Sequence, residues 1–199
     1  MNCGEATTLA RRLRTGKLIV ALLSTIVALL IYWFAPQPTP VSADGMILSV
    51  TDGDTLIVRV ENRKETVRLI GIDAPETAKS PRLDQMAEHS GMSRKRIAQM
   101  GEESKKFVEK ECRGATNVRL EFDAANAPSH RDKYDRLLAY VLLNPKDTGQ
   151  ELFLNEDIVR QGYARAYTSY RFRYSREFRA CEAEAHDGKR GLWATGELP

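Results

Sequence analysis

Residues 50–60 read VTDGDTLIVRV, and residues 66–77 read TVRLIGIDAPET. Aliphatic and β-branched residues dominate both stretches, a composition typical of short strands that face a core. Asp52-Gly53 lies inside the first stretch, and Glu61-Asn62-Arg63 follows it. Both groups of residues favour turns. We therefore predict a meander of three strands, over residues 46–50, 55–60 and 66–72.

The sequence that follows continues this mixed pattern. Two more β-branched runs predict strands over residues 118–122 and 137–143. Apolar residues at helical spacing predict three helices. The first helix covers residues 102–111, and the second covers residues 151–161 and ends at Gly162. The third covers residues 174–187, with Ser175 as its N-cap and Gly188 at its end. Its buried side carries Phe178, Cys181 and Ala185. The expected fold class is α+β and mainly β, a five-stranded barrel covered by three helices.

Residues 78–100 match none of these elements. The segment is polar and includes Lys79, Arg82, Arg94, Lys95 and Arg96. Runs of charge usually mark a solvated surface. We predict a long surface excursion, and a solvated loop is favoured over a clamp on a substrate.

A hydrophobic segment precedes the barrel. Residues 18–35, LIVALLSTIVALLIYWFA, carry no charge and would span about 27 Å as a helix, close to the thickness of a bilayer core. Residues 1–17 before it are basic, which predicts a cytoplasmic N-terminus, one transmembrane helix and a domain on the extracytoplasmic side of the cell membrane. Residues 36–44 form a proline-rich linker, and residues 45–195 form the domain. The alternative is a signal peptide cleaved after Ala43, which would release the domain as a secreted protein.

The net charge of the whole chain is +3, and this excess lies entirely before residue 36. Four basic residues and one acidic residue stand there, which leaves 26 basic and 26 acidic residues in the rest. Bulk charge therefore does not indicate a polyanionic partner, and any such partner must be held by locally placed cations.

The three cysteines, Cys3, Cys112 and Cys181, lack the spacing of a zinc site. Cys112 and Cys181 both fall in the predicted domain. They could pair in an oxidising compartment or remain as two thiols, and the sequence leaves both alternatives open.

Two carboxylates stand at the ends of adjacent predicted strands. Asp54 begins the second strand and Asp73 follows the third, so both could bind one hard cation such as Ca²⁺, which prefers oxygen ligands. Two carboxylates are a sparse ligand set. Water, a backbone carbonyl and a substrate phosphate oxygen would have to complete it.

Nearby residues supply the other parts of metal-assisted phosphodiester hydrolysis. Glu76 lies just beyond Pro75 and could orient or deprotonate an attacking water. Arg68 and Arg136 carry planar guanidinium groups that suit two phosphate oxygens each. Tyr134 and Tyr167 could stack on a base or contact a phosphate.

Five segments in order, VTDGDTLIV, VRLIGIDAPET, DKYDRLLAYV, NEDIVRQGYAR and EAEAHDGKRGLW, resemble the staphylococcal nuclease family. The resemblance covers roughly residues 45–194. It implies an oligonucleotide-binding (OB-fold) barrel with three helices that hydrolyses DNA and RNA with calcium and leaves 3′-phosphates.

The resemblance also assigns roles to individual positions. Asp54, Asp73 and the carbonyl of Ala74 resemble the calcium ligands, and Asp52 the acidic residue just outside them. Glu76 resembles the general base, Arg68 and Arg136 the phosphate-binding arginines, and Lys133, Tyr134 and Tyr167 the nucleotide site. The chain departs from the family at four places: Asp135 replaces a glycine beside Arg136, Tyr170 competes with Tyr167 for the same role, Ala74 replaces a threonine, and residues 78–100 form a long excursion.

Two other functions remain open. The barrel could be a catalytically silent nucleic-acid-binding module, or the acids could bind calcium only to stiffen a loop. The enzyme is favoured because all five catalytic positions are present together. The expected partners are a DNA or RNA substrate and, through the N-terminal helix, the membrane. No protein partner is evident and a monomer is expected, while the preferred nucleic acid and the biological role stay open.

Overall fold

The computed structural model describes residues 23–27, 41–115, 117–144, 150–196 and 198–199. The chain divides into two compact units, residues 1–39 and 40–199. In the first unit only residues 23–27 are described, and they are helical. The remainder of the predicted membrane segment 18–35, residues 1–17 and most of the 36–44 linker lie outside the described residues. Within the described part of the chain, no helix is both long and apolar enough to cross a membrane.

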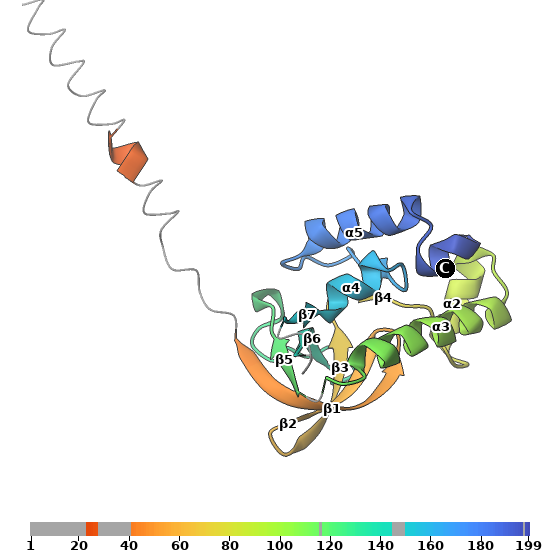
Figure 1. The fold of residues 1–199 in the computed structure, drawn as a ribbon, viewed down its shortest axis with the longest axis horizontal. Coiled ribbons are helices and arrows are strands. Elements are labelled where there is room, and N and C mark those ends of the chain that lie inside the picture. Colours follow the sequence, from red (N-terminus) through yellow and green to blue (C-terminus); the bar gives the residue numbers. More distant parts are fainter. Residues whose placement is uncertain (1–22, 28–40, 116, 145–149, 197) are drawn as a thin grey trace, which may run out of the picture. The chain divides into compact units, whose positions relative to one another are not determined.

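The second unit is built on a closed sheet. Strands β1 (Ser42–Asp52), β2 (Thr55–Val60) and β3 (Arg63–Leu69) form the antiparallel meander that the sequence predicts. β5 (Asn117–Glu121) pairs with β1 and with β6 (Leu137–Leu143). Parallel pairing of β3 with β6 closes the five strands into a barrel, so the mainly-β barrel prediction is confirmed (Figure 1).

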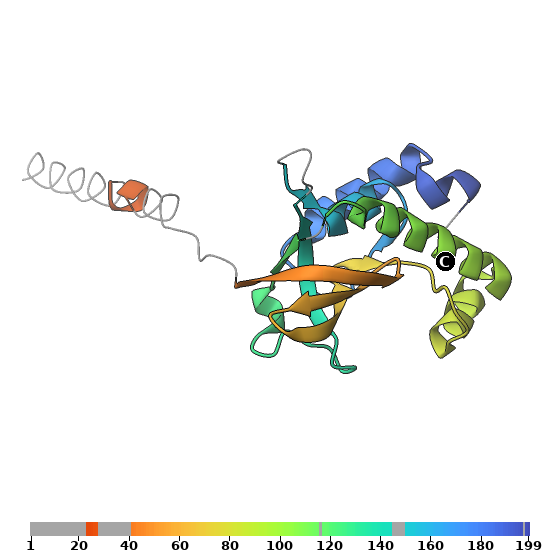
Figure 2. The ribbon, with the colours of Figure 1, turned by 60° about the horizontal axis from the view of Figure 1, so that its bottom comes forward.

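β1 is longer than predicted because it takes part in both halves of the barrel. Its first residues pair with β5 and its later residues with β2, and register shifts between Ile47 and Ser49 and between Val50 and Asp52 let it bend. The strand begins at Ser42, four residues before the predicted 46–50. Figure 2 shows it running beneath α3.

The barrel interior is filled by alternating apolar residues of β2, β3, β5 and β6, and the partly buried Ile47 and Val50 of β1 pack against them. Leu56, Val58, Val67, Leu120 and Val141 are fully buried. This alternation is the period-2 pattern of strands with one face on a core. It therefore explains why strand positions could be predicted from the sequence.

Helices occupy the segment predicted to be a loop, so that prediction was wrong. α2 (Pro81–Ser90) follows Ser80, whose hydroxyl accepts from the Leu83 amide, and Pro81 takes the first helical position. Gly91 ends α2 with a φ of 70°. Ser93 then caps α3 (Arg94–Cys112), which starts eight residues before the predicted 102–111.

The remaining helices lie close to their predicted positions. α4 (Leu154–Arg160) is shorter than 151–161 because Leu152–Phe153 form the edge strand β7. α5 (Ser175–Asp187) ends before Gly188 and buries Phe178, Cys181 and Ala185, as predicted. Ser175 is its first residue and not its N-cap, since no side chain caps it. α3 lies against β1, and α4 lies between β6 and α5 (Figure 1).

A sharp turn at Gly71 separates β3 from the short strand β4 (Ile72–Asp73), so the predicted strand 66–72 is two strands. Gly71 has a φ of 79°, which favours glycine, and the Phe172 ring packs where a Cβ would lie. Asn155, fully buried, donates to the Ile70 carbonyl at 2.9 Å and fixes the turn to α4. β4 then pairs with β8 (Arg165–Ala166). The turn thereby sets the position of Asp73.

Cys112 and Cys181 are both free thiols, so the structure contains no bond between them.

Candidate active site

The ends of two neighbouring strands bring two carboxylates to one guanidinium group. Arg68 Nη1 lies 2.7 Å from Asp54 Oδ2, and Arg68 Nη2 lies 3.1 Å from Asp73 Oδ1. Arg68 sits in β3, directly opposite Thr55 of β2. Because both contacts come from one planar group, the two carboxylates lie close together, as the sequence predicts.

Asp54 is held as a buried anion. It is 6% exposed, its Oδ1 accepts from Thr55 Oγ1 at 2.9 Å, and its Oδ2 accepts from the Ala74 amide at 3.1 Å. Burial raises the pKa of Asp54, but the positive charge of Arg68 and the hydrogen bonds outweigh it and leave the pKa below its usual value. Ala74 thus contacts the cluster through its backbone.

Asp52 lies beside Asp54 and does not contact Arg68. Its Oδ1 accepts from the Asp54 amide at 3.1 Å. Burial, followed by the negative charge of Asp54, raises the pKa of Asp52 to about 7. Asp52 can therefore carry a proton near neutral pH while Asp54 stays ionised.

Glu76 enters the same cluster from the loop after β4. Ser80 Oγ donates to its Oε2 at 3.4 Å, and Arg82 Nε lies 3.2 Å from its Oε1. Burial raises the pKa of Glu76 and the charge of Asp54 raises it further, whereas Ser80, Arg68 and Arg136 lower it by less, so its pKa lies above the usual value. A carboxylate with a raised pKa, next to other charges, is suited to accept a proton.

Arg82 also belongs to the site, although no sequence pattern predicted it there. Arg82 lies in the first turn of α2 and forms an ion pair through Nη2 with Asp73 Oδ1, in addition to its ion pair with Glu76. Its side chain is 37% exposed. Ser80-Pro81 is a typical helix start and could have predicted a helix here. Arg82 would then lie in its first turn, close to Glu76.

Arg136 is positioned by the parallel pairing of β3 and β6, in which Arg68 lies beside Leu138. Its Nε and Nη2 both lie 2.8 Å from Asp132 Oδ2. The side chain is 27% exposed and acts on the pKa of Glu76. Arg136 therefore lies at the edge of the cluster, held by Asp132.

Asp135 does not neutralise Arg136. The Asp135 side chain is 88% exposed, and its nearest cation is Arg131, whose Nε lies 3.6 Å from Oδ1. Its φ of 63° is the left-handed backbone in which a glycine is common. The substitution thus preserves the turn and directs the extra charge to solvent.

Aromatic side chains surround this cluster at the surface. Lys133 Nζ lies 5.0 Å from the centroid of the Tyr134 ring, and Tyr134 is 67% exposed. Tyr167 follows β8 and lies near Arg82. The rings of Tyr167 and Tyr170 lie 5.7 Å apart, so both candidates for the nucleotide site stand together.

Residues 66–195 match the sequence family described as staphylococcal nuclease homologue, over more than half of the chain. The chain belongs to the staphylococcal nuclease family. The match begins in β3 and ends with the 3₁₀ helix η2 (Gly191–Thr195), so it includes Arg68, Asp73, Glu76 and Arg136 but not Asp54.

Three relatives of this staphylococcal nuclease homologue match it over most of its length. It is 30% identical to the thermonuclease of Staphylococcus hyicus over 196 residues, which cover 92% of this chain and 99% of the relative. It is 34% identical to endonuclease YncB of Bacillus subtilis over 72% of this chain and 58% of the relative. An uncharacterised protein of Methanocaldococcus jannaschii is 35% identical over 75% of this chain and 70% of the relative.

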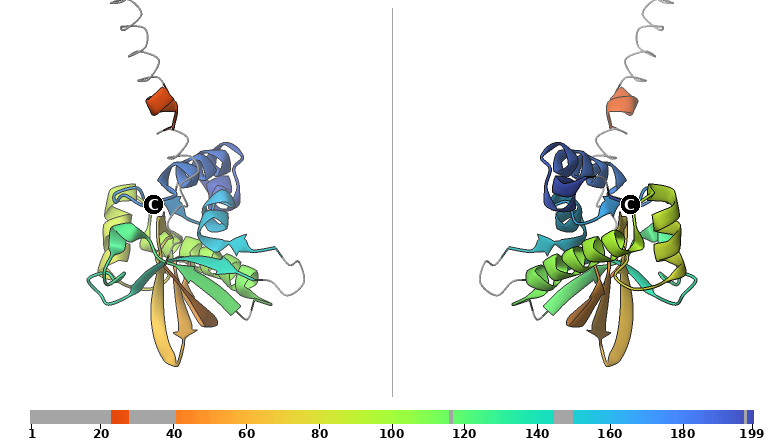
Figure 3. Two further views of the ribbon diagram at one scale, coloured as in Figure 1. Left: turned by 90° about the vertical axis from the view of Figure 1, so that its left-hand side faces the viewer. Right: turned by 90° about the vertical axis from the view of Figure 1, so that its right-hand side faces the viewer.

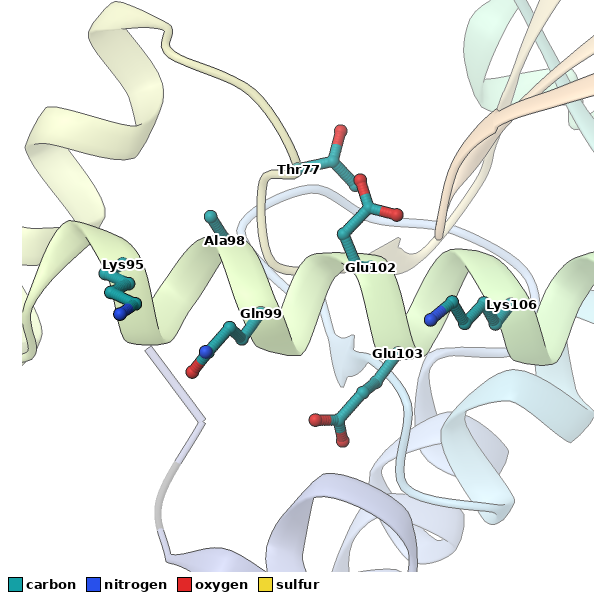
Figure 4. A pocket seen from close by; sticks show the side chains of 7 residues that line it. All are labelled: Thr77, Lys95, Ala98, Gln99, Glu102, Glu103 and Lys106. Carbon is teal, nitrogen blue, oxygen red and sulfur yellow. The ribbon is translucent and has the colours of Figure 1, made fainter.

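A separate hollow lies beside α3. Its volume is about 520 Å³, and Figure 4 shows it between Thr77 and the outer side of the helix. Two lysines and two glutamates supply its charged side chains, and none of the predicted site residues lines it. Its lining consists of Thr77, Lys95, Ala98, Gln99, Glu102, Glu103 and Lys106. The charged cluster, and not this hollow, is therefore the candidate site of the nuclease homologue.

The donor chemistry of the cluster fits a hard cation. Asp54 and Asp73 supply carboxylate oxygens next to each other, and Ca²⁺ binds through such oxygens. Within the described ranges of the chain, no group of three or more acidic, histidine or cysteine side chains is arranged to hold a metal ion. The protein therefore offers a pair of carboxylates, both in contact with Arg68.

Proposed function

We propose that this protein is a calcium-dependent nuclease that hydrolyses phosphodiester bonds of DNA, RNA or both outside the cytoplasmic membrane. The observation that carries the proposal is the joint contact of Arg68 with Asp54 and Asp73, next to Glu76. The names of the thermonuclease and endonuclease relatives support the reaction class.

Asp54, Asp73 and the Ala74 carbonyl would hold the calcium ion. When bound, the ion supplies positive charge that polarises the phosphate. The buried, hydrogen-bonded state of Asp54 keeps it ionised, so it is ready as a ligand without losing a proton. Asp52, which lies beside it with a pKa of about 7, can donate a hydrogen bond when protonated and so orient it.

The protein side chains divide the remaining chemistry. Glu76 orients the attacking water and takes its proton, a role that its raised pKa supports. Arg68 and Arg136 approach the phosphate and offset the negative charge that develops as the bond to the leaving oxygen breaks. Lys133, Tyr134 and Tyr167 line the nucleotide on the exposed side.

The proposed location follows from the uncharged run of residues 18–35 behind a basic N-terminus. This segment anchors the chain in the cell membrane, and the nuclease domain stands on the extracytoplasmic side as a monomer. Cleavage after Ala43 would instead release it. Membrane fractionation, with protease added to intact cells, tests this: a protected domain would contradict it.

The function is tested by incubating the full-length protein with single-stranded DNA and RNA, with calcium or with a chelator. Release of acid-soluble nucleotides is expected only with calcium. Glu76→Gln and Arg136→Ala should lower the rate by at least about 10²-fold. Glu88→Gln makes the same chemical change at an exposed position of α2 and is the matched control.

Two results would contradict the proposal. Equal cleavage with chelator would exclude a calcium requirement. Binding of DNA without cleavage under any divalent cation would instead favour the nucleic-acid-binding module. Activity should also rise towards alkaline pH because the water must lose a proton, so a rate that falls steadily above neutrality would count against Glu76 as the base.

A further inference from the structure

Residues 165–179 read RAYTSYRFRYSREFR and interleave arginine with tyrosine. Five arginines and one glutamate give this segment a net charge of 5 − 1 = +4. Residues 36–199 as a whole carry 26 basic and 26 acidic residues, so the remainder of that part is net negative by the same amount. The domain as a whole is neutral, but residues 165–179 form a locally positive segment within it.

The segment begins beside the active site. β8 pairs with β4, so that Arg165 lies opposite Asp73 and Ala166 opposite Ile72. The Tyr167 amide then donates to the Gly71 carbonyl at 2.8 Å. From there the chain runs through residues 168–174 into the start of α5. A nucleic-acid strand bound at Asp73 could therefore extend from there along residues 167–174.

Buried rings hold the segment in place. Phe172 is 8% exposed and packs on Gly71, and Phe178 is fully buried, with the two ring centroids 5.4 Å apart. The Arg173 amide donates to Asp123 Oδ2 at 2.8 Å. Between these anchors Arg173, Arg176 and Glu177 are exposed, whereas Tyr174 and Ser175 are half-buried. The outward side chains are therefore carried by a fixed backbone and not by a loose tail.

The outward side chains combine charge with aromatic surface. Tyr170 is 71% exposed, and Tyr167 beside it is 38% exposed. Arg171 and Arg176 are also exposed, and neither forms an ion pair with any carboxylate in the described part of the chain. By contrast, the Arg173 guanidinium reaches Glu121 at 3.6 Å. Arg171 and Arg176 are therefore the cations most available to an external anion.

We propose that residues 167–179 form a strip that binds single-stranded nucleic acid beyond the bond being cut. Unpaired bases can stack on Tyr170 while the phosphates contact Arg171 and Arg176. A duplex hides its base faces, so it could use only the charges. The proposal rests on the proposed nuclease function, since that function places the strand at Asp73. It predicts a binding site several nucleotides longer than the active site.

The test measures binding and not cleavage. The full-length protein carrying Glu76→Gln is titrated into fluorescein-labelled oligonucleotides of 3 and 12 nucleotides, and into a 12-base-pair duplex. In this background Arg171→Ala/Arg176→Ala should weaken binding of the 12-mer at least about tenfold and lower the salt dependence by about 1.4 in log–log slope, about 0.7 for each phosphate that is no longer bound. Tyr170→Ala should weaken the 12-mer about fivefold or more with the salt slope unchanged.

The matched control is Arg59→Ala/Arg63→Ala. These two exposed arginines lie on the β2–β3 hairpin, which Figure 3 shows at the opposite end of the domain from α5. The control removes the same charge and should change binding of the 12-mer less than threefold. Thermal unfolding of every variant checks that the fold is retained.

Several outcomes would contradict the proposal that residues 167–179 bind single-stranded nucleic acid. Equal losses in the strip and hairpin variants would mean general electrostatic attraction, and equal affinity for the 3-mer and 12-mer would mean that no extended site exists. Preferential loss of binding to vesicles of anionic lipid, with oligonucleotide binding intact, would assign the arginines to a membrane surface. Because binding is read in an inactivated protein, a failure of the strip and a failure of nuclease activity are seen separately.

Discussion

Arg82, at the first turn of α2, contacts the same Oδ1 atom of Asp73 that Arg68 contacts from the barrel. A residue of α2 thus shares a proposed metal ligand with a residue of the barrel core. Two cations compete there for the position that a metal ion would take.

Arg82→Ala should therefore tighten binding of calcium in the absence of nucleotide, by roughly three- to tenfold, because one competing positive charge is removed. Isothermal titration with calcium alone measures this directly. Arg94→Ala is the control, since Arg94 pairs with the exposed Asp84 and not with a proposed metal ligand. Weaker calcium binding in Arg82→Ala would mean that Arg82 orders the ligands instead of competing.

Arg68 should matter for stability as well as for catalysis. Its side chain is 9% exposed and faces two carboxylates, so Arg68→Ala leaves Asp54 buried without its partner. We expect a loss of about 3 kcal/mol in the free energy of unfolding, measured with urea and chelator. Added calcium should restore part of the loss, and a variant as stable as the wild type in chelator would refute the ion-pair argument.

Asp132, and not Asp135, should determine the position of the Arg136 side chain and thereby its effect on the cleavage rate. Asp135→Gly is expected to change the cleavage rate less than about threefold, because that carboxylate points to solvent. Asp132→Ala removes both ion-pair contacts of the Arg136 guanidinium and should lower the rate about tenfold or more. The reverse ranking would show that the charge beside the arginine outweighs its positioning.

A buried network gives the domain a defined dependence on pH. Asp123 accepts from Tyr140 and from the Arg173 amide. Burial raises the pKa of Asp123, but these hydrogen bonds outweigh it and lower the pKa below its usual value. The stabilisation is thus present above about pH 4 and is lost as pH falls through the lowered pKa.

Tyr140→Phe should accordingly lower the free energy of unfolding by about 2 kcal/mol at pH 7, and by less at pH 2, because the stabilisation from ionised Asp123 falls away below about pH 4. Urea unfolding at both pH values measures the difference. An equal cost at both would assign the effect to packing.

Gly71 and Gly91 provide a matched pair for the turn after β3. Both have positive φ, 79° and 70°, but an added Cβ would strike the Phe172 ring at Gly71 and meets nothing within 4 Å at Gly91. Gly91→Ala should cost about 1 kcal/mol from backbone strain alone. Gly71→Ala should cost about 2–4 kcal/mol, since strain and a displaced core ring add. Similar costs in urea unfolding would mean that Phe172 yields easily.

The sequence predicted the barrel strands and the nearness of Asp54 to Asp73 because both depend on local patterns: alternation of apolar residues and the turn residues between strands. It did not predict α2, whose exposed faces are polar and whose length is set by the caps Ser80 and Gly91. The β4–β8 pairing also escaped prediction. Two-residue strands carry no periodicity, and their partners are far apart in sequence.

Arg82 illustrates what remains beyond sequence reasoning. In the sequence, Arg82 belongs to a charged run that is typical of a solvated surface. It contacts Asp73 only because of the direction in which α2 leaves the preceding loop. Asp135 is the converse case: beside Arg136 in the chain, it points elsewhere because its backbone is left-handed.

The position of α2 between Glu76 and α3 has an evolutionary consequence. α2 starts at a serine cap within four residues of Glu76 and ends at a glycine, so its outer turns can lengthen, shorten or change composition without shifting the strands of the barrel. Selection could thus adjust metal affinity by replacing one side chain at the start of this helix. The same segment offers protein engineers a place to graft a switchable element onto the enzyme.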